Sequence, residues 1–139
     1  MKSYFMIIAM LLATFIAWGP DNTSLAGEKG KSPAIAKPKG GYTIEEVYTK
    51  KDELKGKKVT VRGEVVKFNS NIMGKNWIHI QDGSGKEGTN DLTVTTAPDQ
   101  GANVGDKVLV TGTVTANKDV GAGHKYVVIL EEGTITVEK

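Results

Sequence analysis

The sequence contains no cysteine among its 139 residues. Disulfide frameworks, thiolate metal sites, cysteine nucleophiles and covalent haem attachment are therefore all excluded. Histidine is also scarce, and two histidines without a cysteine do not make a convincing zinc site. The folded part must be stabilised by core packing alone.

Nucleophiles and calcium ligands are equally rare. After the first 26 residues only Ser32, Ser70 and Ser84 remain, and none lies in a G-x-S-x-G setting. The segment 82–86 (DGSGK) fails the calcium-loop pattern, because Lys86 stands where an oxygen ligand is required. We read it as a β-turn, and we expect no enzyme, no cofactor and no metal site.

The bulk composition is that of one soluble globular domain, with 39% hydrophobic and 24% charged residues. A chain this short can bury one modest core, which favours a surface groove over a deep enclosed active site. The formal net charge of +2 says almost nothing about partners.

The N-terminus has the pattern of an export signal. Lys2 precedes an apolar run over 5–18 (FMIIAMLLATFIAW), and small residues stand at Ser24 and Ala26, immediately before Gly27. We predict a signal peptide over 1–26, cleavage between Ala26 and Gly27, and a periplasmic or secreted protein. The alternative is an uncleaved anchor, which needs about 20 apolar residues, more than this run offers.

Residues 27–42 (GEKGKSPAIAKPKGGY) mix glycine, proline and lysine without periodicity, which predicts a flexible basic linker. It is either a solvated spacer or an arm that helps to hold an anionic partner. A helix is expected to start at Thr43, where Thr43 and Glu46 form a capping box, and to end at Gly56. Its apolar residues fall roughly on one face: Ile44, Val47, Tyr48 and Leu54.

From residue 58 the hydrophobic period changes to two, which indicates strands. Segments 58–65 and 107–114 both read K-V-x-V-x-G-x-V, and we expect a bend at the central Gly63 and Gly112. Two further strands are expected at 77–81 and 91–95. The last strand is expected to cover 126–130 and, past a break near Gly133, 134–137. Five strands with central bends predict an all-β fold, a five-stranded OB-fold barrel over 43–139 with a short N-terminal helix packed on it.

Two stretches carry a resemblance to known proteins: V-x-V-x-G-x-V over 59–65, and NIMGKNWIHIQDGSG over 71–85. Together they resemble the anticodon-binding OB domains of class II aminoacyl-tRNA synthetases. The second resembles even more closely small exported bacterial OB proteins, labelled nucleotide- or DNA-binding, some of which are associated with nitrite-reductase systems. The resemblance implies an OB fold over about 43–137 and an outward aromatic at Trp77 on which a base can stack.

Strand alternation sends Ile78 and Ile80 to the core and therefore Trp77 and His79 to the outer face. Arg62 and Thr93 on the neighbouring strands are expected to share that face, together with Thr60, Glu64 and Thr95. Aromatic, imidazole and guanidinium groups can stack bases and hold phosphates. The alternative is that the helix or the first loop covers Trp77.

The loops at 69–75 and 117–125 flank this face, and OB proteins grip ligands with these two loops. They add Lys75, Lys118, His124 and Lys125 as candidate binding residues, although solvated hairpins have the same composition.

Three partners remain open at this point: single-stranded nucleic acid, which is our first expectation, an exported protein, and haem. A haem-carrying OB protein of the periplasm has a histidine and a nearby tyrosine on a C-terminal tail, whereas His124 and Tyr126 here precede the final strand. Binding through phosphates weakens steeply with added salt, which distinguishes nucleic acid from an apolar protein contact.

Overall fold

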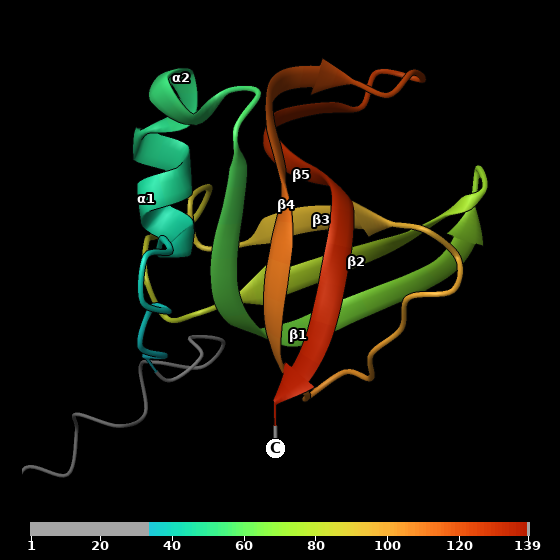
Figure 1. The fold of residues 1–139 in the computed structure, drawn as a ribbon. Coiled ribbons are helices and arrows are strands. Elements are labelled where there is room, and N and C mark those ends of the chain that lie inside the picture. The colour runs from blue at the N-terminus through green and yellow to red at the C-terminus, as the bar shows by residue number, and fades with distance from the viewer. Residues whose placement is uncertain (1–33, 139) are drawn as a thin grey trace, which may run out of the picture. The chain divides into compact units, whose positions relative to one another are not determined.

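A computed structural model describes residues 34–138 (Figure 1). The expected signal peptide and the start of the expected linker lie outside the described residues. The described chain is mostly strand, with two short helices at its N-terminal end. The elements in order are α1 (Ile44–Thr49), α2 (Lys51–Leu54), β1 (Lys58–Ile72), β2 (Lys75–Gln81), β3 (Leu92–Thr96), β4 (Lys107–Asp119) and β5 (Lys125–Glu138).

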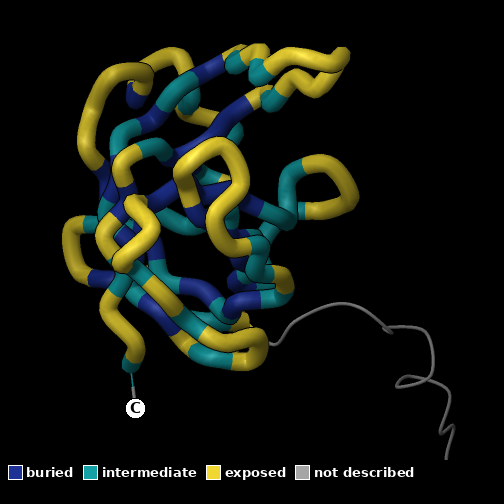
Figure 2. Tube along the Cα trace, turned by 90° about the vertical axis from the view of Figure 1, so that its right-hand side faces the viewer, coloured by how far each residue is buried: buried dark blue, intermediate teal, exposed yellow. Residues whose placement is uncertain are grey.

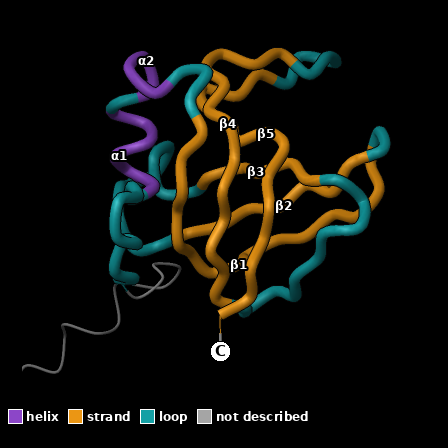
Figure 3. The backbone as a smooth tube through the Cα atoms, viewed as in Figure 1, coloured by secondary structure: helices purple, strands orange, loops and turns teal. Residues whose placement is uncertain are grey.

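The five strands form one closed sheet in the order β1-β2-β3-β5-β4 (Figure 3). β4 returns to β1, so the last strand of the list pairs with the first. All pairs are antiparallel except β3 with β5. The prediction of a mostly-β fold with five strands in a closed sheet is confirmed. The single helix expected from Thr43 to Gly56 is instead two short helices, divided at Lys50.

β1 closes the sheet by changing partners halfway along. Lys58 to Glu64 pair with β4, and Glu64 to Ile72 pair with β2. Figure 1 shows the strand turning sharply between these two halves. Gly63 stands next to the change, and a Cβ on it would lie 3.1 Å from both the Gln81 carbonyl oxygen and the Ile80 Cβ. Glycine therefore allows β1 and β2 to approach closely here, and a larger residue would need its neighbours to shift.

Gly112 has the same role in β4. A Cβ on Gly112 would lie 3.2 Å from the Glu131 carbonyl oxygen and from the Leu130 Cβ. The pairing of β4 with β5 changes register between Thr111 and Thr113. The register shift and the close approach both fit the expected bend at this glycine.

The expected break near Gly133 is absent, because β5 continues without interruption through it. Glu132 adopts a φ of +54°, and the register of β5 shifts against both neighbours at this level. An irregularity of this kind bends a strand without ending it. The last strand is therefore irregular near Gly133, as expected, but the predicted break does not interrupt it.

Alternate side chains of the long strands point into a continuous core, as the period of two predicts (Figure 2). Burying each valine, leucine or isoleucine contributes about 1.5–3 kcal/mol relative to leaving it exposed. The core residues from the sheet include Val59, Val61, Val65, Ile78, Ile80, Leu92, Val94, Val108, Val110, Val114, Val128 and Leu130.

The helix begins as predicted. Glu46 N–H donates to Thr43 Oγ1 and Thr43 N–H donates to the Glu46 carboxylate, which completes the capping box. The sequence did not reveal the part played by Asp82, whose buried carboxylate accepts a hydrogen bond from Ile44 N–H at 2.9 Å. The turn after β2 thereby fixes the helix to the sheet.

The last part of the expected linker is bound to the sheet. Ile35 N–H donates to the Asp82 carbonyl, and Tyr42 bridges to Val61 of β1. Pro38 between them is buried. These contacts differ from the solvated spacer expected up to residue 42.

Candidate ligand-binding groove

Two hairpins project to the same side of the sheet (Figure 1). The β1–β2 turn consists of Met73 and Gly74, and the β4–β5 turn runs from Val120 to His124. Most of the residues expected in flanking loops are therefore strand. Between the hairpins lies a groove of about 320 Å³, which we call the Trp77 groove. It is lined by Lys67, Asn69, Ile72, Met73, Trp77, His79, Val120, His124 and Tyr126.

Trp77 lies half-buried at the centre of the groove rather than fully covered. Its ring lies 6.2 Å from that of Tyr126, with an angle of 28° between the planes. This is the offset-stacked geometry that aromatic pairs favour. The indole Nε1–H donates to the Ile72 carbonyl at 2.9 Å, which fixes the orientation of the ring. The rigid aromatic pair leaves part of the indole open to the groove.

The side chain of His79 is held in place by a hydrogen bond to Asp91. Its Nδ1 lies 2.8 Å from Asp91 Oδ1, and the other carboxylate oxygen of Asp91 accepts a hydrogen bond from Gln81. A carboxylate on Nδ1 fixes the tautomer of a neutral imidazole with the proton on Nδ1, leaving Nε2 as acceptor. The Asp91 carbonyl also accepts a hydrogen bond from the Tyr48 hydroxyl, so the helix and the groove share this residue.

Positive groups outnumber negative groups in the Trp77 groove. Lys67 is exposed, and both histidines of the chain line the groove with it. None of the described lining residues carries a carboxylate. An anionic group in the groove therefore meets a cation, hydrogen-bond donors and an aromatic ring without repulsion from the lining.

A smaller hollow of about 210 Å³ continues from the groove past Trp77. Here Lys75 and Lys118 approach the two carboxylate oxygens of Glu131 at 4.0 and 3.5 Å. We call this space the Glu131 hollow. It is lined by Met73, Lys75, Trp77, Thr95, Lys118, Val120, Ile129 and Glu131.

The sequence placed eight residues at the site, and the structure brings five of them to these two hollows: Trp77, His79 and His124 to the groove, and Lys75 and Lys118 to the Glu131 hollow. Lys125 starts β5 at the base of the hairpin turn and is exposed, but it does not line either hollow.

Arg62 and Thr93 do not share the exposed face as expected. Arg62 lies on the half of β1 that pairs with β4, and its guanidinium donates to the Glu138 carboxylate at 2.6 and 3.3 Å and to the Ala36 carbonyl. Thr93 is only 4% exposed, and every residue of the short strand β3 is buried. Strand alternation predicted on which side of the sheet these two side chains lie. It did not predict that Thr93 is buried or that Arg62 is bound to Glu138.

Lys67 was missed because of a bulge. Val65 pairs with Ile80 and Lys67 pairs with His79, so Val66 is an extra residue in β1. Strict alternation from Val65 would have turned Lys67 inward. In the sequence, the only sign of this bulge is the pair of valines at 65–66, followed by a charged residue.

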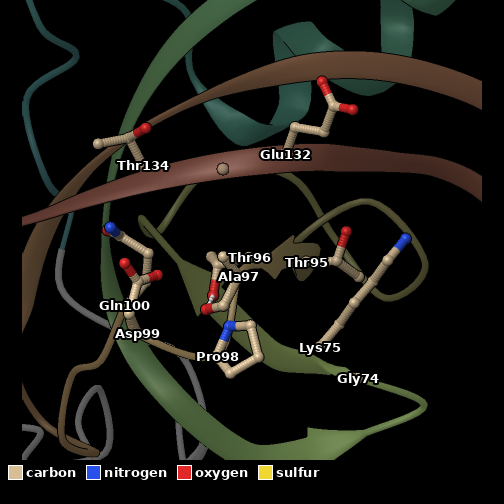
Figure 4. Close-up of a pocket in the computed structure, with 11 residues that line it drawn as sticks. Gly74, Lys75, Thr95, Thr96, Ala97, Pro98, Asp99, Gln100, Glu132 and Thr134 are labelled. Atoms are coloured by element: carbon tan, nitrogen blue, oxygen red, sulfur yellow. Dashed lines mark hydrogen bonds between the residues drawn. The ribbon is translucent and has the colours of Figure 1, made fainter.

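A separate pocket of about 540 Å³ lies beyond the Glu131 hollow, between the segment that follows β3 and the middle of β5 (Figure 4). We call it the β3–β5 pocket. It is lined by Gly74, Lys75, Thr95, Thr96, Ala97, Pro98, Asp99, Gln100, Glu132, Gly133 and Thr134. Buried Asn76 organises its wall by donating hydrogen bonds to the backbone of 97–100.

Over residues 34–138, no group of three or more metal-ligating side chains could hold a metal ion. No helix of that same part is long and apolar enough to span a membrane.

No family model matches the chain, and no curated protein matches it significantly. Solved structures do share its fold. Asparaginyl-tRNA synthetase from Pyrococcus horikoshii is 21% identical with a TM-score of 0.51, covering 70% of this chain and 22% of the synthetase. A chain from Leishmania major Friedlin assigned as an aspartyl-tRNA synthetase is 15% identical with a TM-score of 0.53, at 76% and 23% coverage. The present chain thus spans less than a quarter of either synthetase.

A third similar structure has nearly the size of the present domain. The OBody AM3L09 bound to hen egg-white lysozyme is 19% identical with a TM-score of 0.52, and the match covers 72% of this chain and 95% of the OBody. At these identities the likeness concerns the fold alone. The fold of the described residues is similar to the OB-type domain of tRNA synthetases.

Proposed function

We propose that this chain is a non-catalytic OB-fold domain that binds single-stranded nucleic acid in the Trp77 groove. The observation that carries the proposal is the composition of the groove, in which a stacked Trp77–Tyr126 pair lies beside Lys67 and two histidines with no carboxylate in the lining. Proteins that bind single strands combine these two elements, aromatic platforms for bases and cations for the backbone.

In this proposal the open part of the Trp77 indole stacks on a base. Lys67 and His124, on opposite walls, contact the phosphates on either side, and His79 accepts a hydrogen bond through Nε2. The fold supports the proposal, because two of the similar structures are tRNA synthetases. The resemblance of residues 59–85 to their anticodon-binding domains points the same way.

The direct test is titration of the protein with a deoxyuridine hexamer by calorimetry at several salt concentrations. We expect modest affinity that weakens with salt, because few cations line the groove and phosphate contacts release counterions. Absence of binding at low salt would refute the proposal. Haem, titrated in parallel, is the matched alternative ligand, since His124 and Tyr126 both line the groove.

A second candidate function is binding of an exported protein through the same face. Two large apolar side chains that line the groove are exposed, Ile72 at 46% and Met73 at 69%. Apolar groups gathered in this way are typical of protein contacts. The OBody shows that a similar fold can engage a protein, hen egg-white lysozyme. Affinity that does not change with salt would favour this candidate.

Export is a separate part of the proposal and rests on the N-terminal sequence alone. Protein recovered from the periplasm should begin at Gly27, and its intact mass measures this directly. A mass that includes residues 1–26 would contradict cleavage.

A further inference from the structure

Glu131 lies between two lysines that belong to different hairpins. Lys75 begins β2, and its ammonium nitrogen lies 4.0 Å from Glu131 Oε2. Lys118 stands near the end of β4, and its ammonium nitrogen lies 3.5 Å from Glu131 Oε1. One carboxylate on β5 therefore attracts a cation from each of the two hairpins.

Neither ion pair is tight. Both distances exceed the roughly 2.7–2.9 Å of a direct ammonium–carboxylate hydrogen bond. The Lys75 and Lys118 side chains are 51% and 40% exposed, whereas that of Glu131 is 18% exposed. Ion pairs with exposed partners contribute little to stability, because solvent screens the charges and long side chains lose freedom. The two ammonium groups can therefore exchange the carboxylate for another anion at small cost.

The Glu131 hollow around these charges is small and partly apolar. Its volume of about 210 Å³ is below the roughly 300–1,000 Å³ of pockets that enclose a whole small ligand. It therefore suits one group of a ligand rather than a whole molecule. Apolar side chains lower the local dielectric, which strengthens the attraction between the lysines and an anion. Those in the lining are Met73, Trp77, Val120 and Ile129.

The charges of the hollow favour a phosphate. Its lining holds two cations and one carboxylate, which leaves one positive charge in excess. Each phosphate of a nucleic-acid strand carries one negative charge, so it is attracted to the same two ammonium groups as Glu131. Trp77 lines both the hollow and the Trp77 groove. A strand whose base is stacked on this indole brings its phosphates to the border of the hollow.

We propose that the Glu131 hollow binds one further phosphate of the strand, and that the Glu131 carboxylate competes with this phosphate for Lys75 and Lys118. The inference rests on the proposed function, since the base on Trp77 places the strand. Glu131 lowers the affinity, because a phosphate that enters the hollow must displace the carboxylate or share its cations. Removing this one negative charge makes binding tighter.

The test measures binding of the deoxyuridine hexamer to wild type and to Glu131→Gln by calorimetry, between about 50 and 200 mM salt. Glutamine keeps the size of the side chain and removes its charge. We expect Glu131→Gln to bind about two- to tenfold more tightly at the lowest salt, the equivalent of releasing two exposed ion pairs. The slope of log affinity against log salt should become steeper by as much as about 0.7, the contribution of one phosphate on a single strand.

Two further variants make the test specific. Glu132→Gln is the matched control, because it removes the same charge from the next residue, which is exposed and lines the β3–β5 pocket instead of the hollow. It should leave the affinity nearly unchanged, since solvent screens a charge that does not face the strand. Lys118→Ala should abolish the gain of Glu131→Gln, and in the wild-type background it should cost less, because Glu131 already shares that charge.

A purely structural role of Glu131 predicts a different pattern. If Glu131 only holds the hairpins together, Glu131→Gln lowers the melting temperature and does not tighten binding, which would overturn the inference. We expect the melting temperature to change little, because both ion pairs have exposed partners. An equal gain in Glu132→Gln would also overturn the inference, since the effect would then be one of net charge.

The remaining outcomes separate this inference from the proposed function. If wild type and Glu131→Gln bind the hexamer equally and Trp77→Ala weakens both, the proposed function stands and the inference fails. If Glu131→Gln binds the hexamer and wild type does not, the competition is confirmed and the proposed function of the wild-type chain fails. If neither protein binds at low salt, both fail.

Discussion

The two halves of β1 belong to one continuous strand but have different surroundings. In the first half, Lys58 to Glu64, alternate residues are buried and the strand pairs with β4. In the second half, Lys67 to Ile72, no residue is buried and the strand pairs with β2. Each half carries an outward cation away from the ends of the strand, Arg62 in the first and Lys67 in the second. Arg62 in the first half is held by Glu138, whereas no ion pair is formed by Lys67 within residues 34–138.

This difference shows how a small domain divides its tasks along one strand. The first half packs against the core, and its polar side chains find partners: Thr60 bonds to Thr111 and Arg62 to Glu138. In the second half, Lys67 and Asn69 line the Trp77 groove. A closed sheet provides both environments, because β1 changes its partner from β4 to β2 at Glu64 and its last buried residue is Val65.

The largest expected effect is on packing in the first half. Gly63→Val should destabilise the protein by about 1–3 kcal/mol, because its side chain would meet β2 at van der Waals limits or closer. Gly112→Val should act similarly in β4. In the second half, exposed Ser70→Val should change stability by less than about 0.5 kcal/mol. Thermal or urea unfolding measures all three variants.

If Gly63→Val and Ser70→Val have the same effect, the two halves do not differ in packing. An unchanged melting temperature for Gly112→Val would argue against a required bend in β4.

The next effect concerns binding in the second half. Trp77→Ala should lose about 1–2 kcal/mol of binding to the deoxyuridine hexamer, within the range for one stacked base. Trp77→Phe is the control, since it retains an aromatic surface and should recover part of the affinity. Calorimetry of the three proteins gives the comparison. Binding that is unaffected by Trp77→Ala would move the site out of the groove.

Much of the fold could be predicted because the relevant signals are local. The capping box at Thr43, the period of two in the strands and the glycines of the K-V-x-V-x-G-x-V repeats depend on neighbours in sequence, and they gave the helix start, five strands and a closed sheet. The same alternation put Trp77 and His79 on one face.

The rest depended on contacts between distant residues, which alternation does not encode. The extra residue Val66 places Lys67 in the groove. Glu138, 76 positions away, binds the Arg62 guanidinium and so keeps it from the groove. Thr93 lies on the expected side of the sheet, but every residue of its strand is buried. Asp82 looked like a turn residue, and its role in holding α1 follows only from the folded backbone.

A smaller effect concerns Tyr48, which joins helix α1 to Asp91 and so to the Trp77 groove. Burial, with a contribution from the Asp91 carboxylate, raises the pKa of Tyr48 to about 12. A phenol with a raised folded-state pKa loses its contribution to stability as the pH rises from about 10 to about 12, where the unfolded chain ionises first. Tyr48→Phe should cost about 0.5–1.5 kcal/mol at neutral pH, for the lost hydrogen bond to Asp91.

The measurement is urea unfolding of wild type and Tyr48→Phe at neutral pH and above pH 10. The gap between them should narrow at high pH, and a constant gap would show that Tyr48 does not titrate with unfolding. Tyr42, which is less involved with Asp91, supplies the control as Tyr42→Phe.

The smallest effect distinguishes Arg62 from Lys67, one cation from each half of β1. Each phosphate neutralised on a single strand contributes about 0.7 to the slope of log affinity against log salt. Lys67→Ala should therefore reduce the slope by about 0.7, whereas Arg62→Ala should leave it unchanged, because its charge is already balanced by Glu138 at 2.6 Å. Titrations with the deoxyuridine hexamer between about 50 and 200 mM salt resolve the difference, which amounts to about two- to threefold in affinity across that range.

Arg62→Ala also tests the first half independently, since it should affect unfolding and not binding. Equal changes in slope for the two variants would mean that the phosphate path runs along the whole of β1, and that the bend at Gly63 does not separate a structural half from a binding half.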